Sequence, residues 1–201
     1  MTKLVLATRN RHKVKEISAI LAAAGAPVEL VGLDNYPKAP EVEETGETLE
    51  DNALLKAHSG VTYSGLAAAA DDTGLFVEAL GGEPGVRAAR YSGEDATYES
   101  NNRKLLGALA GVPEAQRTAK FVCVVAYVAP GAVPVIFRGE LAGRIIDAPR
   151  GTSGFGYDPI FVPEGSQRTL AEMPLGEKNR ISHRNRAFRQ LADFLAKPVQ
   201  T

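Results

Sequence analysis

The sequence predicts an α/β protein built around a long mixed β-sheet, and two features carry this prediction. Near the N-terminus, aliphatic runs at 3–8 and 28–33 flank an amphipathic segment, which gives the order strand, helix, strand of parallel pairing. Later, two long apolar runs at 119–129 and 133–146 are separated only by the turn residues PGA, as in an antiparallel hairpin. Both kinds of pairing in one chain predict a mixed sheet with helices, as a single domain over 1–201 with two lobes.

The helices are predicted by periodicity and by capping residues. In the first, the apolar face is formed by Val14, Ile17, Ile20, Leu21 and Ala24, and Gly25 is the stop signal. Thr48 followed by Asp51 fits a capping box and opens a helix to about Ser59. Further helices are expected at 97–110 and 182–196, whereas the Gly/Pro-rich segment 148–165 is expected to be a loop.

Two adjacent acids, Asp71 and Asp72, interrupt an apolar stretch in the middle of the chain. We expect strands at 66–70 and 75–80 with the sequence DDTG between them. One interpretation is a polar turn made with Gly74 through side-chain hydrogen bonds to the backbone. The other places the acids at a strand end, where they hold a metal ion or activate water. The local sequence leaves both open.

Composition and charge limit the possible partners. The chain has 201 residues, 44% of them hydrophobic, and a formal net charge of -1, so no basic field favours nucleic acid or a membrane surface. The single cysteine, Cys123, lies in an apolar run and is expected to be a buried thiol. The first apolar run is too short for a signal peptide, and no stretch approaches the roughly 20 apolar residues of a membrane-spanning helix. We therefore expect a cytoplasmic protein.

The segment TRNRHK, residues 8–13, follows a strand and opens a helix, where backbone N–H groups and the helix dipole favour an anion. Thr8 and Asn10 could donate or accept hydrogen bonds, and Lys13 brings a positive charge. The spaced glycines of a P-loop are missing. The alternative is an ordinary solvated helix start.

The acids in EVEETGETLEDNALLKA, residues 41–57, either complement the helix dipole at the surface or include ligands for a hard cation such as Mg²⁺. Asn52 and Lys56 share a helix face and are either solvated or directed at the same site. The three histidines show no zinc-binding spacing.

The segment SGFGYDP, residues 153–159, combines glycines that allow close backbone approach with aromatic rings that could stack on a base. The alternative is a loop with Phe155 or Tyr157 anchored in the core. A basic cluster follows at 178–189, with Ser182 as a predicted helix N-cap.

Taken in order, the segments TRNRHK, EETGETLEDNALLKA, ADDTGLFVEALGGEPGVRAARYSG, GTSGFGYDPIF and AEMPLGEKNRISHR resemble the inosine triphosphate pyrophosphatase family, over about residues 3–195. The resemblance implies hydrolysis of ITP, dITP or XTP to the monophosphate and pyrophosphate with Mg²⁺. It also implies a mixed sheet with two lobes flanking a substrate cleft, and a homodimer.

The resemblance further implies roles for individual residues. Asp72 would be the catalytic base and a metal contact with Asp71 beside it, and the second metal ligand would be Glu44 or, failing that, Glu43. Apart from the resemblance, a pocket in which Arg184 donates to O6 and the Asp158 region accepts from N1–H would match the donor and acceptor pattern of hypoxanthine and xanthine. The implied substrate-binding residues are Thr8, Arg9, Asn10, Arg11, His12, Lys13, Thr73, Phe155, Gly156, Tyr157, Asp158, Lys178, His183 and Arg184.

Two other functions fit parts of the sequence. Maf-like nucleotide pyrophosphatases share the architecture and reaction but prefer other bases, and the FGYDP and SHR segments favour the inosine type. A nucleotide-binding sensor without catalysis would not need the paired acids together with Lys13.

Overall fold

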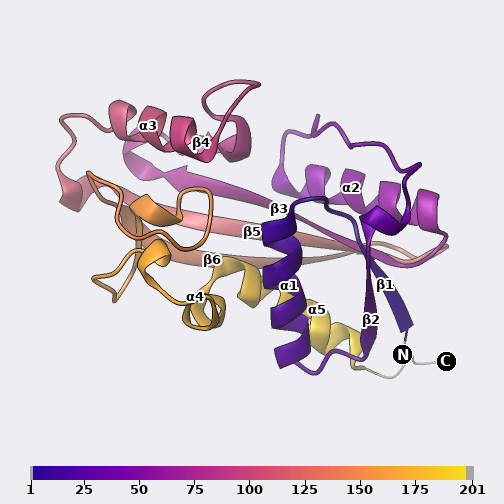
Figure 1. Cartoon of the computed structure of the whole chain (residues 1–201). Helices are drawn as coiled ribbons and strands as arrows, with labels where there is room; N and C mark the ends of the chain where they lie inside the picture. Colours follow the sequence, from indigo (N-terminus) through magenta and orange to yellow (C-terminus); the bar gives the residue numbers. More distant parts are fainter. Residues whose placement is uncertain (1, 198–201) are drawn as a thin grey trace. The chain divides into compact units, whose positions relative to one another are not determined.

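The computed structural model describes residues 2–197, which form a seven-stranded mixed sheet (Figure 1). The strand order is β2 (Val28–Gly32), β1 (Thr2–Leu6), β3 (Ala68–Val77), β5 (Thr118–Val128), β6 (Val135–Ile145) and β7 (Phe161–Pro163), with β4 (Pro84–Gly85) beside β3. Strand β1 pairs parallel with β2 and β3, whereas β4 and β7 pair antiparallel with β3 and β6. The predicted mixed sheet is therefore confirmed.

The chain divides into two compact units, which are described separately. Unit 1 comprises Met1–Asp72, Cys123–Gly139 and Arg184–Thr201, and unit 2 comprises Thr73–Val122 and Glu140–His183. The helices are α1 (Arg11–Ala23), α2 (Leu49–Ser64), α3 (Tyr98–Ala108), α4 (Leu175–Ile181) and α5 (His183–Leu195). Short 3-10 turns lie at Leu33–Asn35, Glu78–Leu80, Ala88–Arg90, Glu114–Gln116, Asp158–Ile160 and Leu170–Glu172.

In unit 1, the two faces of the sheet have different partners because side chains alternate along a strand. Leu4 and Leu6 of β1 join one hydrophobic cluster with residues of α1 and α5, including Ile17 and Phe188. Val5, between them, belongs to a separate cluster with Ala68 of β3. The helices α1 and α5 thus cover one face.

Helix α2 covers the other face of unit 1, and a glycine sets how closely it approaches. A Cβ on Gly60 would lie 2.8 Å from the Cβ of Ala68 and 3.0 Å from that of Ala7, so only glycine permits this contact without a shift. The capping box of Thr48 and Asp51 is present as predicted, but the helix ends at Ser64, five residues later than expected.

Strand β3 is continuous from Ala68 to Val77, and both acids lie in its middle. The predicted break at DDTG is therefore wrong, as are the two interpretations that placed Asp71 and Asp72 in a turn or at a strand end. A buried carboxylate does not require a turn when cations compensate its charge, and both carboxylates have such partners.

Unit 2 has its own hydrophobic core, in which Leu75 and Val77 of β3 join Leu105 of α3, Leu109 at the C-terminal cap of α3 and Phe161 of β7. The segment 148–165 is not loop throughout, because it contains the turn Asp158–Ile160 and strand β7. Helix α4 was not predicted. Ser182 is the C-terminal cap of α4 and also directly precedes α5, which begins at His183.

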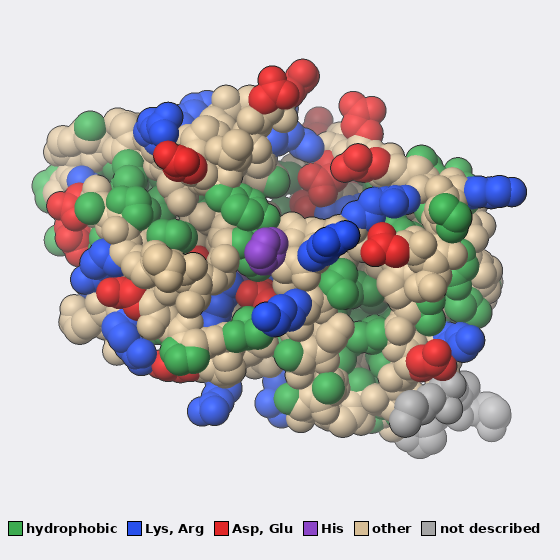
Figure 2. Space-filling model, in the orientation of Figure 1, with side chains coloured by type: hydrophobic (Ala, Val, Ile, Leu, Met, Phe, Trp, Pro, Cys, Tyr) green, Lys and Arg blue, Asp and Glu red, His purple; other side chains and the backbone are tan. Residues whose placement is uncertain are grey.

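Both signs of charge are interspersed on the molecular face shown in Figure 2, in keeping with the small net charge. Cys123 is buried, as predicted. Among residues 2–197, no helix is long and apolar enough to cross a membrane.

Candidate active site

The start of α1 is held by local hydrogen bonds. Asn10 is the N-cap, and its side-chain oxygen accepts from the backbone N–H groups of His12 and Lys13 at 3.0 and 3.2 Å. The hydroxyl of Thr8 accepts from the N–H of Asn10 at 3.2 Å. Arg9 donates to the carbonyl of Ala39 at 2.6 Å. The N–H groups of His12 and Lys13 are thus satisfied by the N-cap. The charged side chain of Lys13 is directed away from this turn, toward Asp71 of β3.

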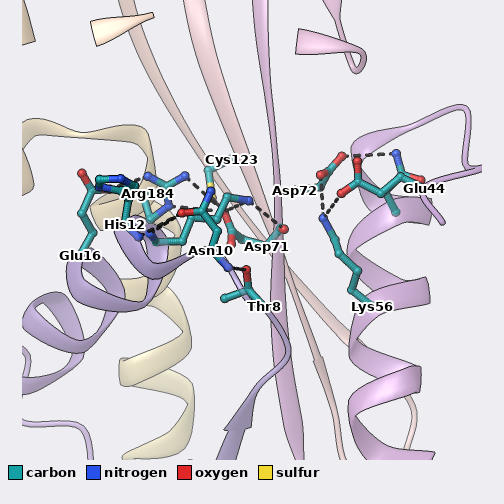
Figure 3. A network of polar contacts seen from close by, with 12 residues as sticks. Thr8, Asn10, His12, Glu16, Glu44, Lys56, Asp71, Asp72, Cys123 and Arg184 are labelled. Carbon is teal, nitrogen blue, oxygen red and sulfur yellow. Dashed lines mark hydrogen bonds and ion pairs between the residues drawn. The ribbon is translucent and has the colours of Figure 1, made fainter. Parts of the chain in front are cut away.

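Lys13 and Arg184 both contact the carboxylate of Asp71, and Figure 3 shows Arg184 between Glu16 and Asp71. The Nζ of Lys13 lies 3.1 Å from Oδ2, and the Nε and Nη2 of Arg184 donate to the same oxygen at 3.3 Å. The Nη1 of Arg184 donates to Oε2 of Glu16 at 2.6 Å. Arg184 is only 2% exposed, and Glu16 and Asp71 are also buried. The result is a buried charge cluster that joins α1, β3 and α5.

The charge cluster keeps Asp71 ionised. Burial alone would raise the pKa of Asp71, but the positive charges of Lys13 and Arg184 outweigh it and hold that pKa well below its usual range. Burial likewise opposes the charge of Arg184, yet Asp71 and Glu16 raise its pKa. A carboxylate held in this way accepts a proton poorly at neutral pH, so its role is to anchor the two cations.

Asp72 contacts a different set of groups, all from the α2 side of unit 1 (Figure 3). The Nζ of Lys56 donates to Oδ1 of Asp72 at 2.8 Å and to Oε1 of Glu44 at 2.6 Å. The amide of Asn52 donates to Oδ2 of Asp72 at 3.3 Å, and its oxygen accepts from the N–H of Gly46 at 2.8 Å. Asn52 and Lys56, one helical turn apart, are therefore directed at the same site.

The alternation of the strand explains why neighbouring acids have separate partners. Asp71 shares its face with Ala69, which packs in the α1 and α5 cluster, and Asp72 shares its face with Ala68 on the α2 side. Adjacent positions in the sequence thereby supply two chemically distinct carboxylates.

Asp72 has the higher pKa of the two acids. Burial raises its pKa, Lys56 lowers it and Glu44 raises it, and the outcome is a pKa above the usual value. Burial also opposes the charge of Lys56, but the pKa of Lys56 is raised because Asp72 and Glu44 are close. Two carboxylates therefore share one ammonium group.

This arrangement fits a hard divalent cation. The oxygens of Glu44 and Asp72 converge on one cationic nitrogen, and Mg²⁺ is commonly held by one or two carboxylates together with water and substrate phosphates. Within residues 2–197, no group of three or more His, Cys, Asp or Glu could hold a metal ion by itself. Of the two predicted glutamates, Glu44 lies in this group, whereas Glu43 is exposed.

A second polar group lies in unit 2, around the loop 154–158. Oδ2 of Asp158 accepts from the backbone N–H of Phe155 at 2.8 Å and from Nζ of Lys178 at 2.5 Å. The same Nζ lies 4.8 Å from the centre of the Phe155 ring. Gly154 has a φ of +76°, and a Cβ there would meet Oδ2 of Asp158 at 2.0 Å, so only glycine allows the loop to close on this carboxylate.

The two aromatic residues of this loop have different surroundings. Tyr157 is buried and donates its hydroxyl to the carbonyl of Ala88 at 2.8 Å, and burial raises its pKa. It is the core anchor that the sequence left undecided, whereas Phe155 is half-buried. His183 is also buried, with its ring stacked on Phe121 at 4.7 Å.

Some predicted site residues lie together and others do not. Lys13, Asp71 and Arg184 form the charge cluster of unit 1, and Phe155, Asp158 and Lys178 form the group of unit 2. Arg11 and His12 are exposed on α1, and Thr73 follows Asp72 in β3. The sequence analysis missed Glu16 and did not assign Asn52 or Lys56. Glu16 lies one helical turn before Ile20, on the apolar face of α1. An acid on an apolar helix face indicates a buried charge that needs a partner, and this pattern could have identified Glu16.

Two carboxylates beside lysines on one strand of an α/β fold are suited to a hydrolase that acts on phosphoanhydrides, because carboxylates can hold a divalent metal ion and lysines can bind phosphate charge. Residues 4–194 match the Ham1 family, and the chain belongs to that family. This confirms the predicted relationship and sets the Maf-like alternative aside.

Several relatives are similar over nearly their whole length. The chain is 53% identical to the dITP/XTP pyrophosphatase of Geobacter sulfurreducens, covering 97% of each chain. It is 54% identical to the dITP/XTP pyrophosphatase of Symbiobacterium thermophilum, covering 96% of this chain and 94% of the relative. Among solved structures, a HAM1 protein from Coxiella burnetii superposes with a TM-score of 0.88 at 39% identity, covering 98% of this chain and all of that one.

Proposed function

We propose that this protein hydrolyses ITP, dITP and XTP to the nucleoside monophosphate and pyrophosphate, and so removes these nucleotides from the cellular pool. The observation that carries the proposal is the group of buried Asp72 with the half-buried Glu44 and Lys56, in a chain about half identical to dITP/XTP pyrophosphatases over nearly its whole length. A sensor that only binds nucleotides would not need a buried carboxylate with a raised pKa beside a second acid.

We assign Asp72 and Glu44 as the ligands of Mg²⁺, which when bound would acidify a water molecule and neutralise phosphate charge. We also assign to Asp72 the proton of the attacking water, since the carboxylate of Asp71 is held by Lys13 and Arg184. Lys56 would keep the two carboxylates together before the metal binds, and Asn52 would orient the second oxygen of Asp72.

We assign Lys13 to the phosphates that leave as pyrophosphate. The side chain of Lys13 is 16% exposed, and its Nζ lies 3.1 Å from the carboxylate of Asp71. Asp71 is fixed in turn by Arg184, so Asp71 and Arg184 would act through Lys13 and not on the substrate. Because Nε, Nη1 and Nη2 of Arg184 donate to Glu16 and Asp71, we assign the contact with O6 of the base to another residue.

We assign recognition of the base to the loop 154–158 with Lys178. Phe155 would stack on the purine and contribute affinity without choosing between bases. Hypoxanthine and xanthine present an O6 acceptor beside an N1–H donor, and adenine presents the reverse pattern. Lys178, whose Nζ lies beside the Phe155 ring, would donate to O6. Adenine has no O6 acceptor, so its binding would leave polar groups of the site without hydrogen-bond partners.

Release of pyrophosphate tests this function. The purified protein with Mg²⁺ is expected to release pyrophosphate from ITP, dITP and XTP much faster than from GTP or ATP, and to lose this activity in EDTA. Release of inorganic phosphate in place of pyrophosphate would contradict cleavage between the α and β phosphates. Equal rates for all five nucleotides would contradict the assigned preference.

We also propose that the protein is a cytoplasmic homodimer, on the strength of its family. Sedimentation at micromolar concentration checks the dimer, and a monomer there would contradict it without affecting the catalytic assignment.

A further inference from the structure

Helix α3 of unit 2 contacts the loop 154–158 through two side chains on one face. Tyr98 and Asn102 are four residues apart, which places them on the same side of a helix. The ring of Tyr98 lies 5.8 Å from that of Phe155, in a tilted arrangement. One turn later, the side-chain amide of Asn102 donates to the carbonyl of Gly156 at 3.1 Å. Two successive residues of the loop therefore each have a partner on α3.

The buried side chain of Asn102 carries a cost in folding free energy. It is 8% exposed, and its Oδ1 has no hydrogen-bond partner among the described residues. The orientation of the amide is fixed, because the carbonyl of Gly156 can only accept and so requires the NH₂ group. A buried acceptor without a partner destabilises the fold. The hydrogen bond from Asn102 to the carbonyl of Gly156 offsets part of this destabilisation.

The loop needs such support because its own backbone is permissive. Gly154 and Gly156 flank Phe155, and both have positive φ values. Glycine loses more conformational freedom on ordering than any other residue, so a ring between two glycines is poorly fixed by the backbone alone. The ring of Phe155 is instead contacted by two side chains. The Nζ of Lys178 lies 4.8 Å from the centre of the ring, and the ring of Tyr98 packs beside it.

We propose that Tyr98 and Asn102 form a clamp that positions Phe155 and Gly156 to receive the purine base. The proposal rests on the function proposed above, in which this loop recognises the base. The clamp residues are positioning residues, since they act through the loop. Pre-organising the loop lowers the entropy that binding must overcome, so the clamp strengthens binding of the base without contributing to hydrolysis.

The clamp predicts a specific kinetic pattern in Tyr98→Ala and Asn102→Ala. The KM for ITP should rise about 2- to 10-fold, the worth of one aromatic pair or one hydrogen bond, while kcat changes less. Inhibition by IMP, which carries the base, should weaken by a similar factor. Inhibition by pyrophosphate, which lacks it, should stay unchanged. Tyr98→Phe should restore the wild-type KM because it keeps the ring.

Tyr63→Ala is the matched control, because Tyr63 lies in α2 and is 45% exposed, close to the 43% of Tyr98. An unchanged KM and unchanged IMP inhibition in Tyr98→Ala, which removes an exposed side chain, would overturn the clamp. Equal loss of IMP and pyrophosphate inhibition would also overturn it, since that indicates general damage. A wild-type protein that releases no pyrophosphate from ITP would overturn the proposed function itself, and this is measured before any variant.

Discussion

Asp71 and Asp72 are consecutive residues of β3, yet their carboxylates contact different lysines, Lys13 at 3.1 Å and Lys56 at 2.8 Å. The first carboxylate has a depressed pKa and the second a raised one. Because a strand directs neighbouring side chains to opposite faces, one dipeptide serves two purposes in unit 1. Asp71 contacts two cations, Lys13 and Arg184, and we propose that Asp72 binds the metal ion and accepts the proton.

Asp72→Asn should keep the fold and lose nearly all turnover of ITP, because it retains the shape of the side chain and removes its charge. Loss of a general base costs about 10²–10⁴-fold in rate. Thermal unfolding and pyrophosphate release, measured on the same preparation, check both parts. Turnover near the wild-type rate would show that Asp72 has another role.

Lys13→Ala should weaken binding of ITP much more than binding of inosine. A charge-assisted hydrogen bond to phosphate contributes about 1.5–3 kcal/mol to binding. Inosine has no phosphate, so its affinity should not depend on Lys13. Calorimetric titration with each ligand measures the difference. Lys15→Ala, also in the first half of α1 but exposed, is the control and should leave both affinities unchanged. Equal losses for inosine and ITP in Lys13→Ala would place Lys13 outside the phosphate site.

Arg184→Met should destabilise the protein by about 3–5 kcal/mol, because it leaves the buried acids Glu16 and Asp71 without their shared cation. Adding Glu16→Leu to this variant should recover part of the loss, which urea unfolding measures. The ratio of kcat/KM for ITP and ATP should stay near the wild-type value in Arg184→Met. A ratio that narrows instead would show that Arg184 reads the base, as the sequence first suggested.

Lys56→Met should tighten binding of Mg²⁺ in the absence of nucleotide, because the ammonium group competes with the metal for Glu44 and Asp72. Glu44→Gln should weaken the same binding, since it removes one of the two charges. Isothermal titration with MgCl₂ alone compares both variants with the wild type. If Glu44→Gln binds Mg²⁺ as the wild type does, the second ligand lies elsewhere.

Several features were predictable because they depend on residues close together in the chain. The capping box of Thr48 and Asp51, the end of α1 before Gly25 and the buried face of α5 each follow from contacts within a few residues. The family was also recognisable, because five motifs occur in a fixed order along the chain.

The sequence by itself determined the strands β1, β2, β5 and β6, most helices and the family, because periodicity and capping act over short distances. Only the tertiary structure decided that β3 continues through Asp71 and Asp72, because the cations that make this possible come from α1, α2 and α5. Glu16 and Arg184 both lie on apolar helix faces, which signals a need for charged partners, but they are 168 positions apart. No local pattern can select one partner over such a separation, since the choice depends on how α1 and α5 pack against the same strand.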